Sequence, residues 1–225
     1  SWQEPMPEGW QRWVFDEYEM PYDTLHDADI RGGALSGYDV LLFQAQDAQS
    51  IREGYDQGEL PERYTGGLAH RGIAAVKAFV ENGGRVIAIE AATEFVADLF
   101  DLDISKSTEG LSNTDFYIPG SILRLELDTS SQINQGMRSE VSSWYWRSSM
   151  AYEVNDSRVR VAARYGSGDP LLSGWVLGGE HIAGKPAILK VSREFEAAHG
   201  VAARIERNLW LVRTRFEQDY GGRPW

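Results

Sequence analysis

Residues 85–100 of this 225-residue chain read RVIAIEAATEFVADLF, and this stretch decides the fold. Its opening apolar run, VIAI, is continuous, as in a parallel strand that is covered on both faces. A helical pattern follows at once, in which Phe95, Val96 and Leu99 are apolar and Thr93 is placed to cap the helix. The stretch therefore predicts a strand that turns directly into a helix.

The same alternation of elements precedes this stretch. Residues 38–43 (YDVLLF) predict a second buried strand, and residues 73–80 carry an apolar stripe at helical spacing that ends at a pair of glycines. An earlier helix is predicted around Trp10 and Trp13. Strands and helices in this order predict βαβ units, and therefore an α/β fold with a doubly wound, mainly parallel sheet.

Beyond about residue 112 the pattern changes to strands. Alternating or continuous apolar residues predict strands at 121–127 (SILRLEL), 158–165 (RVRVAARY) and 187–191 (AILKV). We expect a strand-rich C-terminal extension of one domain that runs from residue 1 to residue 191. The tail, 192–225, has apolar residues at helical spacing and ends in GGRPW, so we expect it to be divergent, helical and partly frayed.

Composition excludes several classes of function. The chain has 34 acidic and 22 basic residues and a formal net charge of -12, so we expect no nucleic-acid partner. No apolar run approaches the ~18 residues that a membrane span needs. Cysteine is absent, which excludes disulfides, a thiolate nucleophile and thiolate metal sites.

The turn inside residues 85–100 is the first candidate site. In open α/β sheets, ligands and catalytic groups gather at the carboxyl ends of strands. The turn consists of Glu90, Ala91, Ala92 and Thr93, and the alanines have no side chain with which to attack a substrate. We therefore expect a vestigial elbow pocket without a catalytic residue. An enzyme that uses Glu90 as a general base is an alternative.

His26 and Asp29 are the one closely spaced pair of metal-ligand type. Their spacing approaches the His-x-x-Glu pair of carboxypeptidases, but a catalytic zinc needs a third protein ligand, and none accompanies them. We expect a solvated loop here, no metal site and no cofactor in this chain.

Three consecutive aromatic residues, Trp144, Tyr145 and Trp146, form the last candidate site. Alternating aromatic side chains on a strand can stack on sugar rings or on peptides. They can also pack one face into the core and leave the other partly exposed. Both interpretations remain open from the sequence.

Six stretches, in order along the chain, carry a resemblance to a known domain. They are residues 8–16 (EGWQRWVFD), 25–31 (LHDADIR), 64–68 (YTGGL), 75–80 (AVKAFV) with the following Gly83-Gly84, 115–124 (DFYIPGSILR) and 169–175 (DPLLSGW). With them the chain resembles the class I glutamine amidotransferase-like domain found C-terminal to the peptidase domain in some bacterial zinc carboxypeptidases of the carboxypeptidase A/T-like family.

This resemblance implies a flavodoxin-like sheet from which the amidotransferase cysteine is absent. It implies that hydrolysis, and the zinc, belong to an upstream peptidase domain of the same polypeptide, which is then the expected partner. A secreted or cell-envelope location follows from the resemblance alone. Two departures stand out: the first strand of such domains is missing before the Trp10 helix, and residues 192–225 do not follow the usual C-terminal pattern.

We expect a non-catalytic accessory domain of a zinc carboxypeptidase. The first alternative is a carbohydrate- or peptide-binding module that uses Trp144, Tyr145 and Trp146. The second is a hydrolase-like enzyme that uses Glu90.

Overall fold

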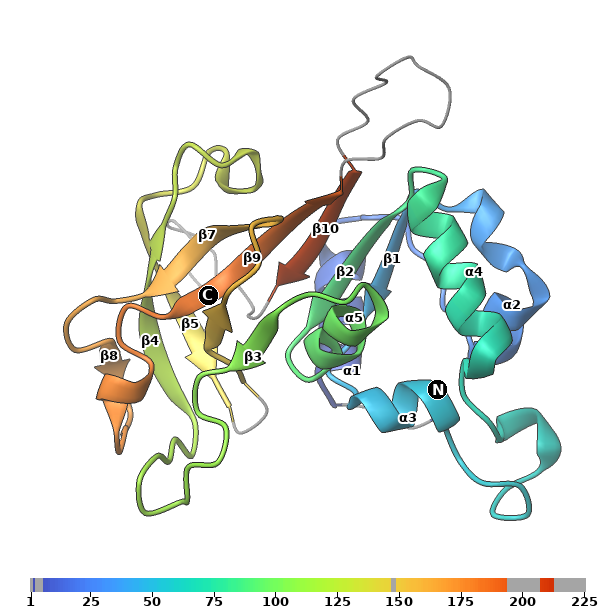
Figure 1. Ribbon diagram of the computed structural model, residues 1–225, viewed down its shortest axis with the longest axis horizontal. Coiled ribbons are helices and arrows are strands. Elements are labelled where there is room, and N and C mark those ends of the chain that lie inside the picture. Colours follow the sequence, from blue (N-terminus) through green and yellow to red (C-terminus); the bar gives the residue numbers. More distant parts are fainter. Residues whose placement is uncertain (1, 3–5, 147–148, 194–206, 213–225) are drawn as a thin grey trace. The chain divides into compact units, whose positions relative to one another are not determined.

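The chain folds as a mixed α/β protein (Figure 1). The structure, a computed structural model, describes residues 2, 6–146, 149–193 and 207–212. These residues divide into two compact units, which we describe separately. Unit 1 contains the described residues up to Asp103 together with residues 156–159, 190–193 and 207–212. Unit 2 contains the described residues of 104–155 and residues 160–189.

Unit 1 holds the predicted strand-helix alternation. Its helices are α1 (Met6–Glu17), α2 (Asp27–Gly32), α3 (Ala48–Glu53), α4 (Ala69–Glu81) and α5 (Ala92–Leu99), with short 3-10 helices η1 (Ala34–Gly37) and η2 (Glu62–Tyr64). Its strands are β1 (Val40–Phe43), β2 (Arg85–Ile89) and β10 (Arg207–Val212).

Strands β1, β2 and β10 form the parallel part of the structure. Val40 of β1 lies opposite Arg85 of β2, and Val212 of β10 lies opposite Ile89 on the other edge of β2. The predicted βαβ unit is confirmed, because α3 and α4 connect two parallel strands. Strands β1 and β2 are direct neighbours in the sheet.

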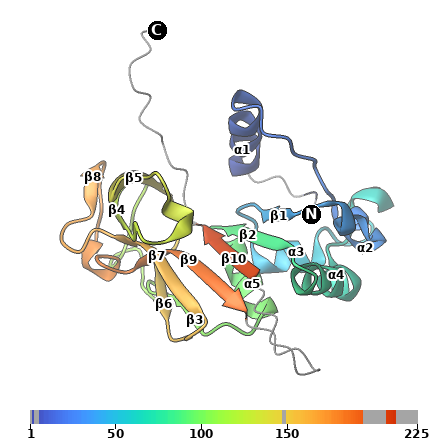
Figure 2. The ribbon, with the colours of Figure 1, turned by 90° about the horizontal axis from the view of Figure 1, so that it is seen from above.

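The helices on one side of this sheet pack as the sequence predicts. Phe95 and Val96 of α5 and Val86 and Ala88 of β2 are all fully buried. Helix α1 lies on the opposite side of β1 and β2 from α3, α4 and α5 (Figure 2). None of its residues is buried, so its apolar stripe is open to solvent.

Strand β10 corrects the expectation of a helical tail. The apolar residues of 207–212 fit one face of a helix, but the same run is continuous, as in a strand covered on both faces. Parallel pairing with β2 decides between the two. The other residues of the tail beyond Arg193 lie outside the described part of the chain.

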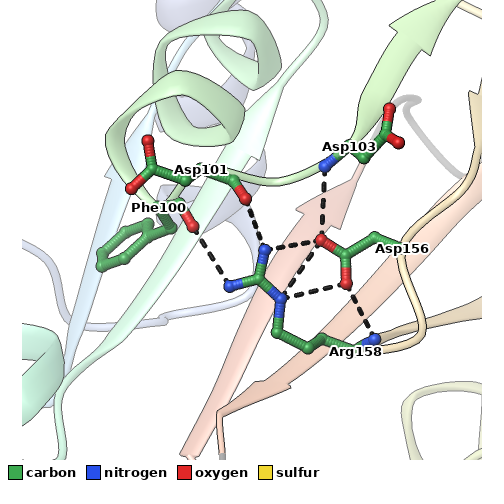
Figure 3. A network of polar contacts seen from close by, with 5 residues as sticks. All are labelled: Phe100, Asp101, Asp103, Asp156 and Arg158. Carbon is green, nitrogen blue, oxygen red and sulfur yellow. Dashed lines mark hydrogen bonds and ion pairs between the residues drawn. The ribbon is translucent and has the colours of Figure 1, made fainter.

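The C-terminal end of α5 is held by a charged network within unit 1 (Figure 3). The guanidinium of Arg158 donates hydrogen bonds to the backbone carbonyls of Phe100 and Asp101. Positive charge is favourable there because the last carbonyls of a helix carry partial negative charge. The carboxylate of Asp156 accepts from Arg158 and from the backbone amide of Asp103.

Unit 2 consists mainly of strands. They are β3 (Ile104–Lys106), β4 (Ser121–Leu127), β5 (Glu140–Tyr145), β6 (Tyr152–Val154), most of β7 (Val159–Tyr165), β8 (Leu171–Ser173) and the first half of β9 (Pro186–Arg193), with 3-10 helices η3 (Gln132–Asn134) and η4 (Gly179–His181).

The pairing in unit 2 is antiparallel, which corrects the expectation of a mainly parallel sheet. Strand β4 pairs antiparallel with β5, β7 and β8, and β3 pairs antiparallel with β6. Buried and half-buried residues alternate along β4, so one face of β4 packs inward and the other meets solvent. Such alternation is typical of antiparallel sheets.

Among the residues that the structure describes, no helix is long and apolar enough to cross a membrane.

Candidate functional site

Trp144 and Trp146 form an exposed aromatic pair at the end of β5. Side chains alternate between the two faces of a strand, and Trp144 is 43% exposed whereas Tyr145 is 2% exposed. Trp146 directly follows the strand and is 46% exposed. The two indole rings have centroids 6.0 Å apart and planes 23° apart. We refer to Trp144 and Trp146 as the tryptophan pair.

Tyr145, which lies between the two tryptophans in the sequence, does not belong to the exposed pair. Its ring is buried at 5.9 Å from the ring of Tyr165 and 6.1 Å from that of Phe116. One face of this segment thus packs inward through Tyr145, and Trp144 and Trp146 lie on the partly exposed side. The binding role of the exposed side stays a prediction.

Gly120 makes room for the tryptophan pair. A Cβ atom at this position would lie 3.0 Å from Cζ2 of Trp144 and 3.1 Å from Cζ3 of Trp146. The φ angle of Gly120 is +153°, a conformation that other residues rarely adopt. Both indoles therefore lie against a bare stretch of backbone just before β4.

Buried serines hold the backbone beneath the exposed rings. The backbone amide of Trp146 donates to Oγ of Ser149 over 2.8 Å, and the amide of Ser149 donates back to the carbonyl of Trp146 over 2.9 Å. Ser149 is itself buried. These reciprocal bonds fix the position of Trp146 without using its side chain.

A third exposed tryptophan, Trp175, is held in a similar way. Oγ of Ser121, which is buried, accepts from the amide of Trp175 over 3.0 Å and donates to its carbonyl over 2.7 Å. The ring of Trp175 is 51% exposed and lies 5.8 Å from the ring of Tyr117. No local pattern in the sequence marks Trp175 as a site residue, because the contact that places it joins residues 54 positions apart.

Polar side chains share the strand face that carries Trp144. Alternate positions of β5 put Ser142 and Glu140 on this face, and Ser142 lies opposite Arg124 of β4. Nε of Arg124 is 3.9 Å from Oε2 of Glu140, and both side chains are well exposed. The site therefore combines flat apolar rings with donors and acceptors that remain open to solvent.

The elbow after β2 consists of Glu90, Ala91, Ala92 and Thr93. Glu90 has a φ angle of +52°, so the strained residue of this turn is the glutamate. Ala91 is the N-cap of α5. Ala92 and Thr93 are buried, and the Thr93 hydroxyl donates to the Glu90 carbonyl instead of capping the helix. The elbow pocket stays a prediction.

His26 and Asp29 lie at the start of α2, where His26 is the N-cap residue. The backbone amide of His26 donates to Oδ2 of Asp29 over 2.8 Å at the start of α2. The His26 ring stacks on Trp2, with ring centroids 3.6 Å apart and planes 11° apart. Across the described part of the chain, no group of three or more histidine, aspartate or glutamate side chains is arranged to hold a metal ion.

Comparisons with known proteins give only a distant likeness. No protein-family model matches the sequence, and no curated protein matches it either. Among solved structures, a candidate GMP synthase subunit from Thermoplasma acidophilum is 13% identical with a TM-score of 0.42, covering 84% of this chain and 67% of that one. A cytoplasmic protein from Salmonella typhimurium is 12% identical with a TM-score of 0.39, covering 86% of this chain and 65% of that one.

This chain thus spans about two thirds of the length of each of these proteins. Both TM-scores lie below 0.5, so the α/β assignment rests on the strand pairings described above.

Proposed function

We propose that this chain is a non-catalytic accessory domain that binds a carbohydrate or a peptide through Trp144 and Trp146. One observation carries the proposal: two large aromatic side chains, each nearly half exposed, lie with nearly parallel rings. Tryptophan is usually buried to a large extent. Two exposed indoles on a fixed backbone are typical of a surface that gains contacts when a ligand binds.

The family resemblance supplies the wider setting of this proposal. As an accessory domain of a zinc carboxypeptidase, with a flavodoxin-like, glutamine amidotransferase-like core, the chain would position a substrate or associate with the cell wall. The peptidase zinc would belong to another domain of the same polypeptide.

A second candidate function is favoured by the φ angle of Glu90. Strained backbone often marks functional positions, and the turn after β2 is where open α/β sheets place reactive groups. A hydrolase-like enzyme using Glu90 as a general base is therefore the alternative. Of the two proposals, binding by the tryptophan pair has the stronger support. It rests on two exposed side chains and on the hydrogen bonds that hold the backbone of Trp146, whereas the alternative rests on one φ angle.

Binding of the full chain to immobilised glycans and peptides tests the proposal. We expect retention of the chain on at least one of these ligands and loss of retention for Trp144→Ala and Trp146→Ala. The matched control is Trp10→Ala, which removes an equally exposed tryptophan from unit 1. Equal retention of all three variants, or no retention of the parent chain, would contradict the proposal. Hydrolysis of a substrate that is lost on Glu90→Gln would favour the alternative.

A further inference from the structure

We infer that the tryptophan pair holds a neutral, β-linked pyranose chain, with sugar rings lying on the indole faces. This inference rests on the proposed function and narrows its ligand from two classes to one. The main observation behind it is that two nearly parallel indoles share one face of β4 and β5 with the exposed ion pair between Arg124 and Glu140.

The shape of the surface favours sugar rings over a peptide. The indole planes are only 23° apart and the rings are stacked with centroids 6.0 Å apart, so the flat apolar faces on the outside of the stack have nearly the same orientation. Successive rings of a β-linked pyranose chain also present flat faces of C–H groups, with hydroxyl groups around the rim. An extended peptide turns successive side chains to opposite sides of its backbone, so its side chains do not form one continuous flat face.

The polar neighbours suit hydroxyl groups. Arg124 offers only donors and Glu140 only acceptors, and their 3.9 Å separation and exposed side chains leave both open to further hydrogen bonds. A sugar hydroxyl can donate to the carboxylate and accept from the guanidinium at once. Ser142, opposite Arg124, adds a hydroxyl group that can do either.

Charge limits the ligand to neutral or cationic chains. The formal net charge of the protein is -12, and the face beside Trp144 carries Glu140 and Glu126 as well as Arg124. An anionic polysaccharide or a nucleic acid would be repelled at long range. An uncharged chain of hexoses or N-acetylhexosamines has no such penalty.

The area of the pair is too small for a stable protein interface. A tryptophan offers at most about 250 Å², and each member is less than half exposed, so the pair supplies less than about 250 Å² in total. A specific protein-protein interface needs ~800 Å² from each partner. A second copy of this chain is therefore a poorer occupant than a small ligand. Hydrogen bonds to Ser149 already fix the backbone of Trp146. Binding therefore costs little backbone conformational entropy at this residue.

Titration of the full chain with soluble hexasaccharides tests this inference. The probes are cellohexaose and N-acetylchitohexaose, with an uncharged hexapeptide and heparin as comparisons, followed by calorimetry and tryptophan fluorescence. We expect one of the neutral hexasaccharides to bind, with little dependence on salt concentration. Trp144→Ala and Trp146→Ala should each weaken binding about fivefold or more. Trp10→Ala should leave it unchanged, and thermal melts should show all variants folded.

Three results would overturn the inference. Binding of the hexapeptide with no binding of either sugar would overturn the ligand class and leave the proposed aromatic binding function standing. Sugar binding that survives both substitutions in the pair would place the sugar elsewhere. A dimer that dissociates on Trp144→Ala would make the pair an interface between copies and would refute the proposed function too.

Discussion

The guanidinium of Arg158 donates two hydrogen bonds to the carboxylate of Asp156, with Nε 3.0 Å from Oδ1 and Nη2 2.6 Å from Oδ2. The Arg158 side chain is the main cause that holds the pKa of Asp156 well below its usual range, and the backbone amides of Arg158 and Asp103 act in the same direction. The same guanidinium donates to the backbone carbonyls at the end of α5. The ionisation state of Asp156 therefore affects the stability of this helix end.

Acid should weaken unit 1 through Asp156. A carboxyl group whose pKa is lowered by folding adds stability above its unfolded pKa of about 3.9, and this contribution is lost as pH falls below that value. At pH 7, Asp156→Asn should lower the free energy of unfolding by about 1–2 kcal/mol, a figure reduced because Arg158 is 40% exposed. The difference from the parent should shrink toward pH 2. Urea unfolding across this range measures it, with the exposed Glu94→Gln as control, and a constant difference would contradict the assignment.

Arg158→Lys should destabilise the chain although it keeps the charge. Lysine lacks the planar fork that reaches a carboxylate and two carbonyls together. We expect a loss of about 1 kcal/mol, seen as a fall of about 2–4 °C in melting temperature for a chain of this size. Arg85→Lys, at the exposed start of β2, is the matched control. Equal effects of the two substitutions would show that only charge matters at position 158.

Glu90→Gly should raise the melting temperature. The left-handed conformation costs a residue with a Cβ roughly 1–2 kcal/mol, and glycine removes this cost but loses about 0.5–1 kcal/mol in chain entropy. We expect a net gain of up to about 1.5 kcal/mol. Glu94→Gly, inside the first turn of α5, should instead destabilise by about 1 kcal/mol. Similar losses for both variants would mean that the elbow is not strained.

Gly120→Ala should separate the indoles of the tryptophan pair. The new Cβ would press on both rings, and we expect the near-ultraviolet circular dichroism from the coupled indoles to fall. Gly136→Ala is the control, because its φ angle is also positive, at +82°, but its Cβ would meet nothing within 4 Å. If both variants lose the signal equally, backbone strain and not ring contact is responsible.

Local signals in the sequence account for most of the individual elements. The run at 85–89 and the helix that follows it are found where they were predicted, because apolar period and length suffice to identify them. The strand predicted at 121–127 also has the expected bounds. Strand β10 was predicted as a helix, since a short apolar run fits either form until a partner strand is known.

The candidate site was predicted only in part. Strand alternation predicts that the side chains of residues 144–146 point to opposite faces. It does not predict which of the two faces is buried. The inward position of Tyr145 depends on its contacts with Tyr165 and Phe116, and the place of Trp175 depends on Ser121. Such pairings join distant parts of the chain and leave no local pattern.

The pairing of β2 with β10 also determines the order in which the protein can fold during synthesis. Residues 85–89 emerge from the ribosome more than a hundred residues before their partner at 207–212, and one edge of β2 stays open throughout that interval. Folding that waits for such distant contacts is slow, and an open strand edge is prone to wrong pairing. The nascent chain is therefore most vulnerable to aggregation before β10 has been synthesised.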